Sequence, residues 1–407
     1  MRVAYVTMRF PAPSETFAGT DVSVLRAAGV AVDVYCLRGA HERHEPMLRE
    51  RGLDGLSVRP MTARRALSGL ALAVRGAPRA LRLVWWLAAH AWRRPDHLLK
   101  GLALLPGALT IADDLERGGY DVVHLFWGHY PAIVGEALMR LPGRPVVSTF
   151  LGAYDLSTGF GPSLDLARRA DVVFTHAAVN VEAITAHGVP RERVLVVHRG
   201  VPPSLLERAA ALDPSLRDPR RVVSVARLIP SKGMADVIEA FARTAAERSD
   251  ASLVVLGDGP ERGKLEALAR ERGLDGRVDF RGHRPQAEVF AELARAGAFV
   301  MLSTKGDERL PNVVKEAMAC GCLPIVVATP GIDELVEDGV TGFVLPSPDH
   351  AQVAERVEAV LRGGPHVDAM RQRARERITE RFDARVSMDA YLRAWRGARD
   401  AARTGAP

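Results

Sequence analysis

The sequence predicts an α/β protein of two domains, each built on a doubly wound parallel sheet. Its 407 residues exceed what one hydrophobic core usually supports, so two domains are the natural expectation. Short β-branched runs alternate with helical patterns through most of the chain, which is typical of βαβ units. The runs are apolar at nearly every position, as in strands that helices cover on both faces.

The first domain is predicted over residues 1–203. In chain order the pattern predicts strand 3–7, helix 17–28, strand 30–36, strand 121–125, helix 133–140, strand 145–150, strand 171–175, helix 178–187 and strand 194–197. A basic insertion at about residues 61–112 combines arginines with Trp85, Trp86 and Trp92. The sequence supports two interpretations of the insertion equally well. It forms a surface that lies on an anionic bilayer, or it forms helices that pack Leu and Trp against the core.

A hinge is predicted over residues 204–220, where Pro and Asp-Pro breakers interrupt the periodicity around a short helix at 205–212. The second domain is predicted over residues 221–380. Its expected elements are strand 221–226, helix 234–246, strand 252–256, helix 261–272, strand 278–280, helix 287–296, strand 299–302, helix 313–320 and strand 325–328. A C-terminal helix, residues 381–407, is expected to cross back to the first domain. The strand ends of two such sheets would surround one cleft, where open α/β sheets bind ligands.

The net charge of +6 comes largely from arginine and suits a phosphate-bearing ligand or an anionic lipid surface. Nucleic acid is not expected, because no basic run is interleaved with aromatic residues. Three cysteines, Cys36, Cys320 and Cys322, are too few for a disulfide framework and indicate the cytoplasm. Zinc is not expected at Cys320 and Cys322, since no second pair exists, and no Asp-x-Asp at a strand end indicates another divalent metal.

The most informative segment follows a predicted strand and reads Ser303-Thr-Lys-Gly-Asp-Glu-Arg-Leu-Pro-Asn-Val-Val-Lys-Glu-Ala-Met-Ala-Cys-Gly-Cys-Leu-Pro324. Pro311 suits the first position of a helix. The free amides from Asn312 onward would then point at the strand end and attract a phosphate. Glu308 in the loop and Glu316 in the helix can accept hydrogen bonds from two hydroxyl-bearing parts of one ligand, such as a sugar and a ribose.

Two glutamates separated by seven residues, followed by Ala-Met-Ala-Cys-Gly, resemble the donor-site signature of family 4 retaining glycosyltransferases. That family has the GT-B fold, two Rossmann-like domains facing across a cleft. Residues 225–233, Val-Ala-Arg-Leu-Ile-Pro-Ser-Lys-Gly, are similar to the family's segment whose Arg and Lys hold the diphosphate. The resemblance implies that Glu308, Arg227 and Lys232 are catalytic. It implies donor contacts at Glu316, Gly257, Gly259, His283, Asn312, Val313 and Thr16.

From the residues alone, other interpretations of these positions stay open. Arg227 and Lys232 could be solvated side chains after a strand. The glycines near Gly257 and Gly282 could serve turn geometry alone.

In the first domain, Ser14-Glu-Thr-Phe17 and residues 146–155, Val-Val-Ser-Thr-Phe-Leu-Gly-Ala-Tyr-Asp, resemble the family's colanic-acid and exopolysaccharide branch. Leu151 stands where many members have a histidine. The resemblance makes Asp155 an acceptor-side catalytic candidate. Asp155 and three histidines, His124, His129 and His176, could compensate for the missing histidine, although a half-buried structural role suits His124 and His176 equally.

The resemblance implies an enzyme that transfers a hexose from a nucleoside-diphosphate sugar to an acceptor hydroxyl with retention, and that needs no further cofactor. The acceptor is expected to be a saccharide or lipid-linked saccharide of exopolysaccharide or cell-surface glycan synthesis. The expected location is the cytoplasm or the inner face of the cell membrane. Three alternatives stay open: a tailoring transferase of a soluble natural product, a nucleotide-sugar epimerase, and a non-catalytic donor-binding scaffold.

Overall fold

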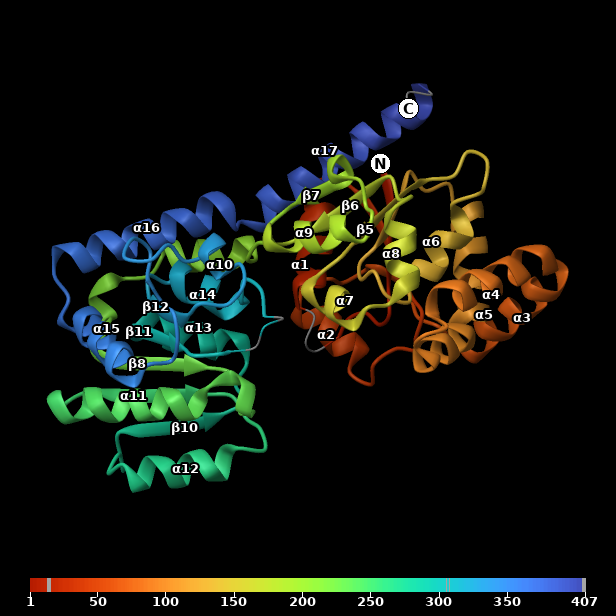
Figure 1. Ribbon diagram of the computed structural model, residues 1–407. Helices are drawn as coiled ribbons and strands as arrows, with labels where there is room; N and C mark the ends of the chain where they lie inside the picture. Colours follow the sequence, from red (N-terminus) through yellow and green to blue (C-terminus); the bar gives the residue numbers. More distant parts are fainter. Residues whose placement is uncertain (13–15, 305, 307, 405–407) are drawn as a thin grey trace. The chain divides into compact units, whose positions relative to one another are not determined.

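The computed structural model describes residues 1–12, 16–304, 306 and 308–404. The chain divides into two compact units. The first contains residues 1–199 and the C-terminal segment from residue 384, and the second contains residues 200–383. Each unit holds a parallel sheet with helices on both faces, so the predicted α/β class is confirmed (Figure 1).

The first unit is built on a seven-stranded sheet with the order β3-β2-β1-β4-β5-β6-β7. Its strands are β1 (Arg2–Thr7), β2 (Ala31–Cys36), β3 (Ser57–Arg59), β4 (Val122–Leu125), β5 (Val146–Phe150), β6 (Val172–Thr175) and β7 (Val194–Val196). All neighbouring strands pair in parallel; for example, Val6 of β1 lies in register with Leu125 of β4. The strand order reverses between β1 and β4, which creates a ligand-binding switch point at the carboxyl ends of these strands.

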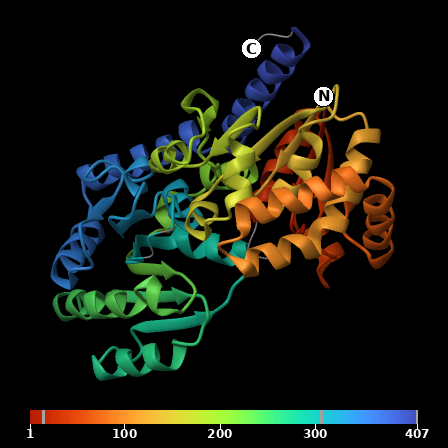
Figure 2. The same cartoon turned by 45° about the vertical axis from the view of Figure 1, so that its right-hand side comes forward.

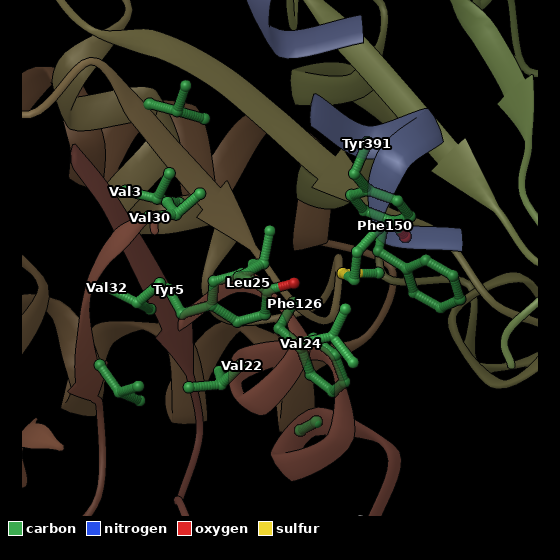
Figure 3. Packing of buried hydrophobic residues seen from close by; sticks show 14 of the residues in the cluster. Val3, Tyr5, Val22, Val24, Leu25, Val30, Val32, Phe126, Phe150 and Tyr391 are labelled. Carbon is green, nitrogen blue, oxygen red and sulfur yellow. The ribbon is translucent and has the colours of Figure 1, made fainter. Parts of the chain in front are cut away.

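Helices cover both faces of this sheet. They are α1 (Thr16–Ala27), α2 (His44–Glu50), α3 (Ala63–Arg75), α4 (Ala77–Ala91), α5 (Pro95–Arg117), α6 (Ala132–Leu138), α7 (Ala153–Thr158), α8 (Gly161–Ala167), α9 (Val179–Ala186) and α17 (Ala384–Thr404). The α1 and α17 helices pack together on one face, where Tyr391 of α17 lies among side chains of β1, β5 and α1 (Figure 3). The basic insertion forms α3, α4 and α5, which pack against one another (Figures 1 and 2).

The second unit is built on a six-stranded parallel sheet with the order β10-β9-β8-β11-β12-β13. Its strands are β8 (Asp218–Val225), β9 (Ser252–Leu256), β10 (Val278–Gly282), β11 (Ala296–Met301), β12 (Leu323–Val327) and β13 (Phe343–Leu345). Its helices are α10 (Pro203–Ala210), α11 (Met234–Glu247), α12 (Arg262–Glu271), α13 (Gln286–Arg295), α14 (Asn312–Ala319), α15 (His350–Arg362) and α16 (Pro365–Arg381). The α11, α12 and α15 helices pack together on one side of the sheet, and α10, α13, α14 and α16 pack together on the other.

The predicted hinge differs from the structure. Residues 204–220, predicted as a hinge, lie within the second unit, because Pro203 opens α10 at a position where proline is tolerated, and α10 packs on α14. At the C-terminus, α16 ends at Arg381 in the second unit, and α17 belongs to the first unit, to which the C-terminal helix was expected to return. Among the residues described, no helix is both long enough and apolar enough to cross a membrane.

Candidate functional site

The second unit brings Lys232 and Glu308 together at the carboxyl ends of its strands. Lys232 closes a 3₁₀ turn (Pro230–Lys232) after β8, and Glu308 lies in the loop between β11 and α14. The Lys232 ammonium forms an ion pair with Oε1 of Glu308, and the Ser303 hydroxyl lies 2.6 Å from Oε2 of the same carboxylate. Both charged side chains are 17% exposed, so a ligand can reach the pair.

The loop that carries Glu308 reaches α14 through a strained residue. Leu310 is buried and has a φ of 47°, in the left-handed region that a bulky side chain seldom adopts. Such strain is kept where the surrounding structure fixes the backbone, and it is frequent at ligand sites. Pro311 then precedes the first helical residue, Asn312, and Asn312 and Val313 of the first turn are half-buried.

Glu316 lies on α14 one turn after Asn312 and is half-buried. Burial raises the pKa of its carboxyl to about 7, against the opposing effects of a hydrogen bond from Gln286 and the charge of Lys315. The Gln286 side-chain amide donates to Oε1 of Glu316 at 3.0 Å. A carboxyl with this pKa can either donate or accept a hydrogen bond near neutral pH. His283 is exposed in the turn after β10, three residues before Gln286.

The glycines at these strand ends permit close backbone packing. Gly257 has a φ of 131°, and a Cβ atom there would lie 1.8 Å from the carbonyl oxygen of Ala226. A Cβ atom on Gly259 would lie 2.4 Å from the carbonyl oxygen of Leu228. The chain that carries Arg227 is therefore held tightly against the turn after β9. Arg227 itself is exposed.

In the first unit, Asp155 is 1% exposed and holds His129. Its carboxylate accepts hydrogen bonds from the backbone N–H of Gly152 at 2.9 Å and of His129 at 3.2 Å, and Oδ1 lies 3.1 Å from Nδ1 of His129. These contacts suit a residue that positions His129, whose other ring nitrogen, Nε2, is not used by this pair. Thr16 is exposed at the start of α1, while Ser14 and Glu15 of the same motif lie outside the described residues.

His129 lines a cavity of about 630 Å³ in the first unit. The walls come from residues that follow β1, β2, β4 and β5, and from the first turns of α5. The cavity therefore lies at the carboxyl ends of the strands that flank the switch point, where ligands bind in open α/β sheets.

The other two candidate histidines have different surroundings. His124 is fully buried, its Nδ1 lies 2.9 Å from the Ser148 hydroxyl, and its ring contacts Tyr391 and Trp395. Burial holds the pKa of His124 well below its ordinary value, which fits a neutral structural residue. His176 is half-buried, and its ring centroid lies 5.6 Å from that of Phe150.

Arg199, which the sequence pattern did not single out, lies in an aromatic cluster at the strand ends of the first unit. It is 7% exposed, and its guanidinium lies 3.8 Å from the ring centroid of Phe150 and 4.4 Å from those of Phe17 and Phe126. These contacts are cation–π interactions. The aromatic partners come from three separate segments of the chain, so no local pattern around Arg199 could have indicated them.

Two family models match this chain. A model described as "Glycosyltransferase Family 4" matches residues 15–205, and one described as "Glycosyl transferases group 1" matches residues 213–377. The putative colanic acid biosynthesis glycosyltransferase WcaL of Salmonella typhimurium is 26% identical over 94% of this chain and 96% of its own length. The amylovoran biosynthesis glycosyltransferase AmsK of Erwinia amylovora is 29% identical over 95% of this chain and 97% of its own length.

Solved structures share the fold. Anabaena HepE in complex with UDP has a TM-score of 0.71 at 17% identity and covers 98% of this chain and 100% of that chain. The lipopolysaccharide outer core galactosyltransferase WaaB has a TM-score of 0.67 at 17% identity. It covers 97% of this chain and 99% of that chain.

The two parallel α/β units and these matches define a glycosyltransferase of the GT-B fold. Within that class, the chain belongs to glycosyltransferase family 4, as the sequence motifs predicted.

Proposed function

We propose that this enzyme transfers a hexose from a nucleoside-diphosphate sugar to an acceptor hydroxyl, with retention of the anomeric configuration, in exopolysaccharide or cell-surface glycan synthesis. One observation carries the proposal: the Lys232–Glu308 pair, joined by Ser303, at the strand ends of the second unit. The names of WcaL and AmsK and the UDP bound in HepE support a nucleotide-sugar donor and a polysaccharide product.

The residues of the second unit suit specific roles in this reaction. Lys232 and the exposed Arg227 would neutralise the donor diphosphate. The diphosphate would replace Glu308 as the ion-pair partner of Lys232. These cations and the amides at the start of α14 would stabilise the charge that develops on the leaving diphosphate. That group would accept the proton of the acceptor hydroxyl. Glu308 would then be free to bind hexose hydroxyls, and Glu316 would bind a ribose hydroxyl.

Donor binding tests this proposal directly. Thermal unfolding would be followed with a panel of UDP-, GDP- and ADP-sugars, because a ligand of the folded state raises the apparent stability. We expect one donor to stabilise the wild type and Lys232→Met to weaken its binding by about tenfold or more, the loss of a charged contact. Lys264→Met, at an exposed position on α12, should bind donor as the wild type does. The absence of a shift with every donor would contradict the proposal.

We propose that the enzyme works at an anionic membrane surface and that the insertion provides the contact. Exposed apolar side chains follow one face of α3 (Leu67, Leu70, Val74) and one face of α4 (Leu81, Val84, Trp85), at helical spacings of three and four residues. Trp92, directly after α4, and Leu99, on α5, are also exposed. Basic residues accompany them and are exposed: Arg64, Arg75, Arg93, Arg94 and Lys100. This combination suits a helix surface that lies in the interface of an anionic bilayer.

Vesicle sedimentation tests the membrane contact. The wild type should bind phosphatidylglycerol vesicles and not phosphatidylcholine vesicles, and salt should weaken the binding. Replacing both Trp85 and Trp92 by Ser should reduce binding by about tenfold or more, because two interfacial aromatics are lost. Leu216→Ser, at a residue of the second unit that is 70% exposed, is the matched control and should bind normally. Failure of the wild type to bind anionic vesicles would contradict the membrane contact and would favour a soluble acceptor.

A further inference from the structure

The cavity of the first unit has walls suited to a sugar ring. Five aromatic side chains line it, namely Phe17, Trp127, Tyr130, Tyr154 and Phe160. Tyr154 is 56% exposed, so its ring is available to a ligand. Aromatic faces bind the apolar faces of ring ligands, while a few polar groups fix the orientation. The His129 ring contributes such a polar group, because Asp155 fixes its Nδ1 side.

The same cavity carries positive charge without a matching carboxylate. Arg38 follows β2 and Lys100 lies on α5, and both side chains are exposed and line the cavity. Among the described lining residues none is Asp or Glu, and over the described chain neither Arg38 nor Lys100 forms an ion pair. Two cations that face one cavity without a partner attract an anionic group of a ligand.

We propose that this cavity binds the acceptor as a saccharide that carries an anionic group on, or next to, the sugar that receives the hexose. The aromatic rings bind the sugar, Arg38 and Lys100 bind the anionic group, and Nε2 of His129 forms a hydrogen bond with a hydroxyl. A uronate carboxylate and a sugar phosphate both supply this charge. The inference rests on the proposed function and specifies the acceptor class of that reaction.

The test compares acceptors that differ only in charge. Binding to the donor-free protein would be measured by titration calorimetry and by tryptophan fluorescence, to which Trp127 in the cavity contributes. The ligands are a neutral disaccharide, its uronate counterpart and its phosphorylated counterpart. We expect at least one anionic form to bind about tenfold or more tightly than the neutral form. The form that binds more tightly, uronate or phosphate, identifies the source of the charge. Equal binding of all three forms, or binding of none, would overturn the inference.

Variants separate binding by the two cations of the cavity from the effect of the protein's overall charge. The double variant Arg38→Gln, Lys100→Gln should lose the preference for the anionic forms and keep the affinity for the neutral disaccharide. Arg49→Gln, at an exposed arginine of α2 outside the cavity, should keep the preference. A separate measurement of donor binding by the second unit distinguishes a failure of this inference from a failure of the proposed function. Normal donor binding without an acceptor preference refutes this inference alone, whereas loss of donor binding refutes the proposed function.

Discussion

At the scale of single residues, Glu316 combines burial with a neutral hydrogen-bond partner, Gln286. Its carboxyl has a pKa of about 7 in the folded protein and an ordinary value of 4.5, so folding favours the protonated form between these values. The stability that this group contributes is full below pH 4.5 and is lost as the pH rises through 7.

Glu316→Gln should remove this pH dependence, because the amide cannot ionise. Relative to the wild type, we expect the variant to gain at most about 3 kcal/mol of unfolding free energy near pH 8 and almost none near pH 4.5. Urea unfolding at the two pH values measures the difference. The matched control is Glu380→Gln, at an exposed position near the end of α16, which should show no such dependence. A stability difference that is the same at both pH values would contradict the assigned cause.

The contacts of Asp155 suit a residue that positions His129. Asp155 was predicted as an acceptor-side catalytic group, and the structure surrounds its carboxylate with hydrogen-bond donors from His129 and Gly152. Leu151, which the resemblance marked as a departure from the family pattern, is fully buried in an apolar cluster. Two imidazoles line the cavity of the first unit instead: His129 from the loop after β4, and His97 from the start of α5.

At the scale of elements, the close contact between the ends of β8 and β9 depends on a glycine. In Gly257→Ala the new Cβ would clash with the carbonyl oxygen of Ala226, and the φ of 131° would be strained. We expect a loss of about 2–4 kcal/mol in the unfolding free energy of the second unit.

Gly263→Ala is the matched control for this prediction. It places a methyl group on α12 where no atom lies within 4 Å, so stability should stay unchanged or rise by up to about 1 kcal/mol. Denaturant unfolding compares the two variants. If Gly257→Ala were as stable as the wild type, the backbone contact between Gly257 and Ala226 would be less tight than described.

At the scale of the whole chain, the C-terminal helix α17 completes the core of the first unit. Trp395 of α17 is fully buried, and its indole N–H donates to the Ser148 hydroxyl at 2.9 Å, 247 residues earlier in the chain. Removal of this buried tryptophan leaves a cavity, and it takes one of two hydrogen-bond partners from the Ser148 hydroxyl, which keeps His124.

Trp395→Ala should therefore destabilise the first unit by about 3–5 kcal/mol. Denaturant unfolding followed by fluorescence and by circular dichroism should show an earlier transition for the first unit, while the second unit unfolds as before. Arg396→Ala, at the exposed neighbouring position, should change the stability by less than about 0.5 kcal/mol. An unchanged first transition in Trp395→Ala would show that α17 is not needed for the core.

The α/β class, most strands and helices and the family could be predicted from the sequence, because these depend on local periodicity and on contiguous motifs such as residues 303–324. Short or half-exposed elements were missed, among them β3 and β13, because a three-residue strand carries too little periodicity to be recognised.

The contacts between residues far apart in the chain could not be predicted from the sequence and are seen in the folded structure. Lys232 contacts Glu308 across 76 residues, and Trp395 of the C-terminal helix joins the first unit. The pairing of His129 with Asp155, and the location of Arg38 and Lys100 at one cavity, likewise follow from the order of the strands in the sheet. Strand order is set by non-local packing, and no local pattern in the sequence contains that information.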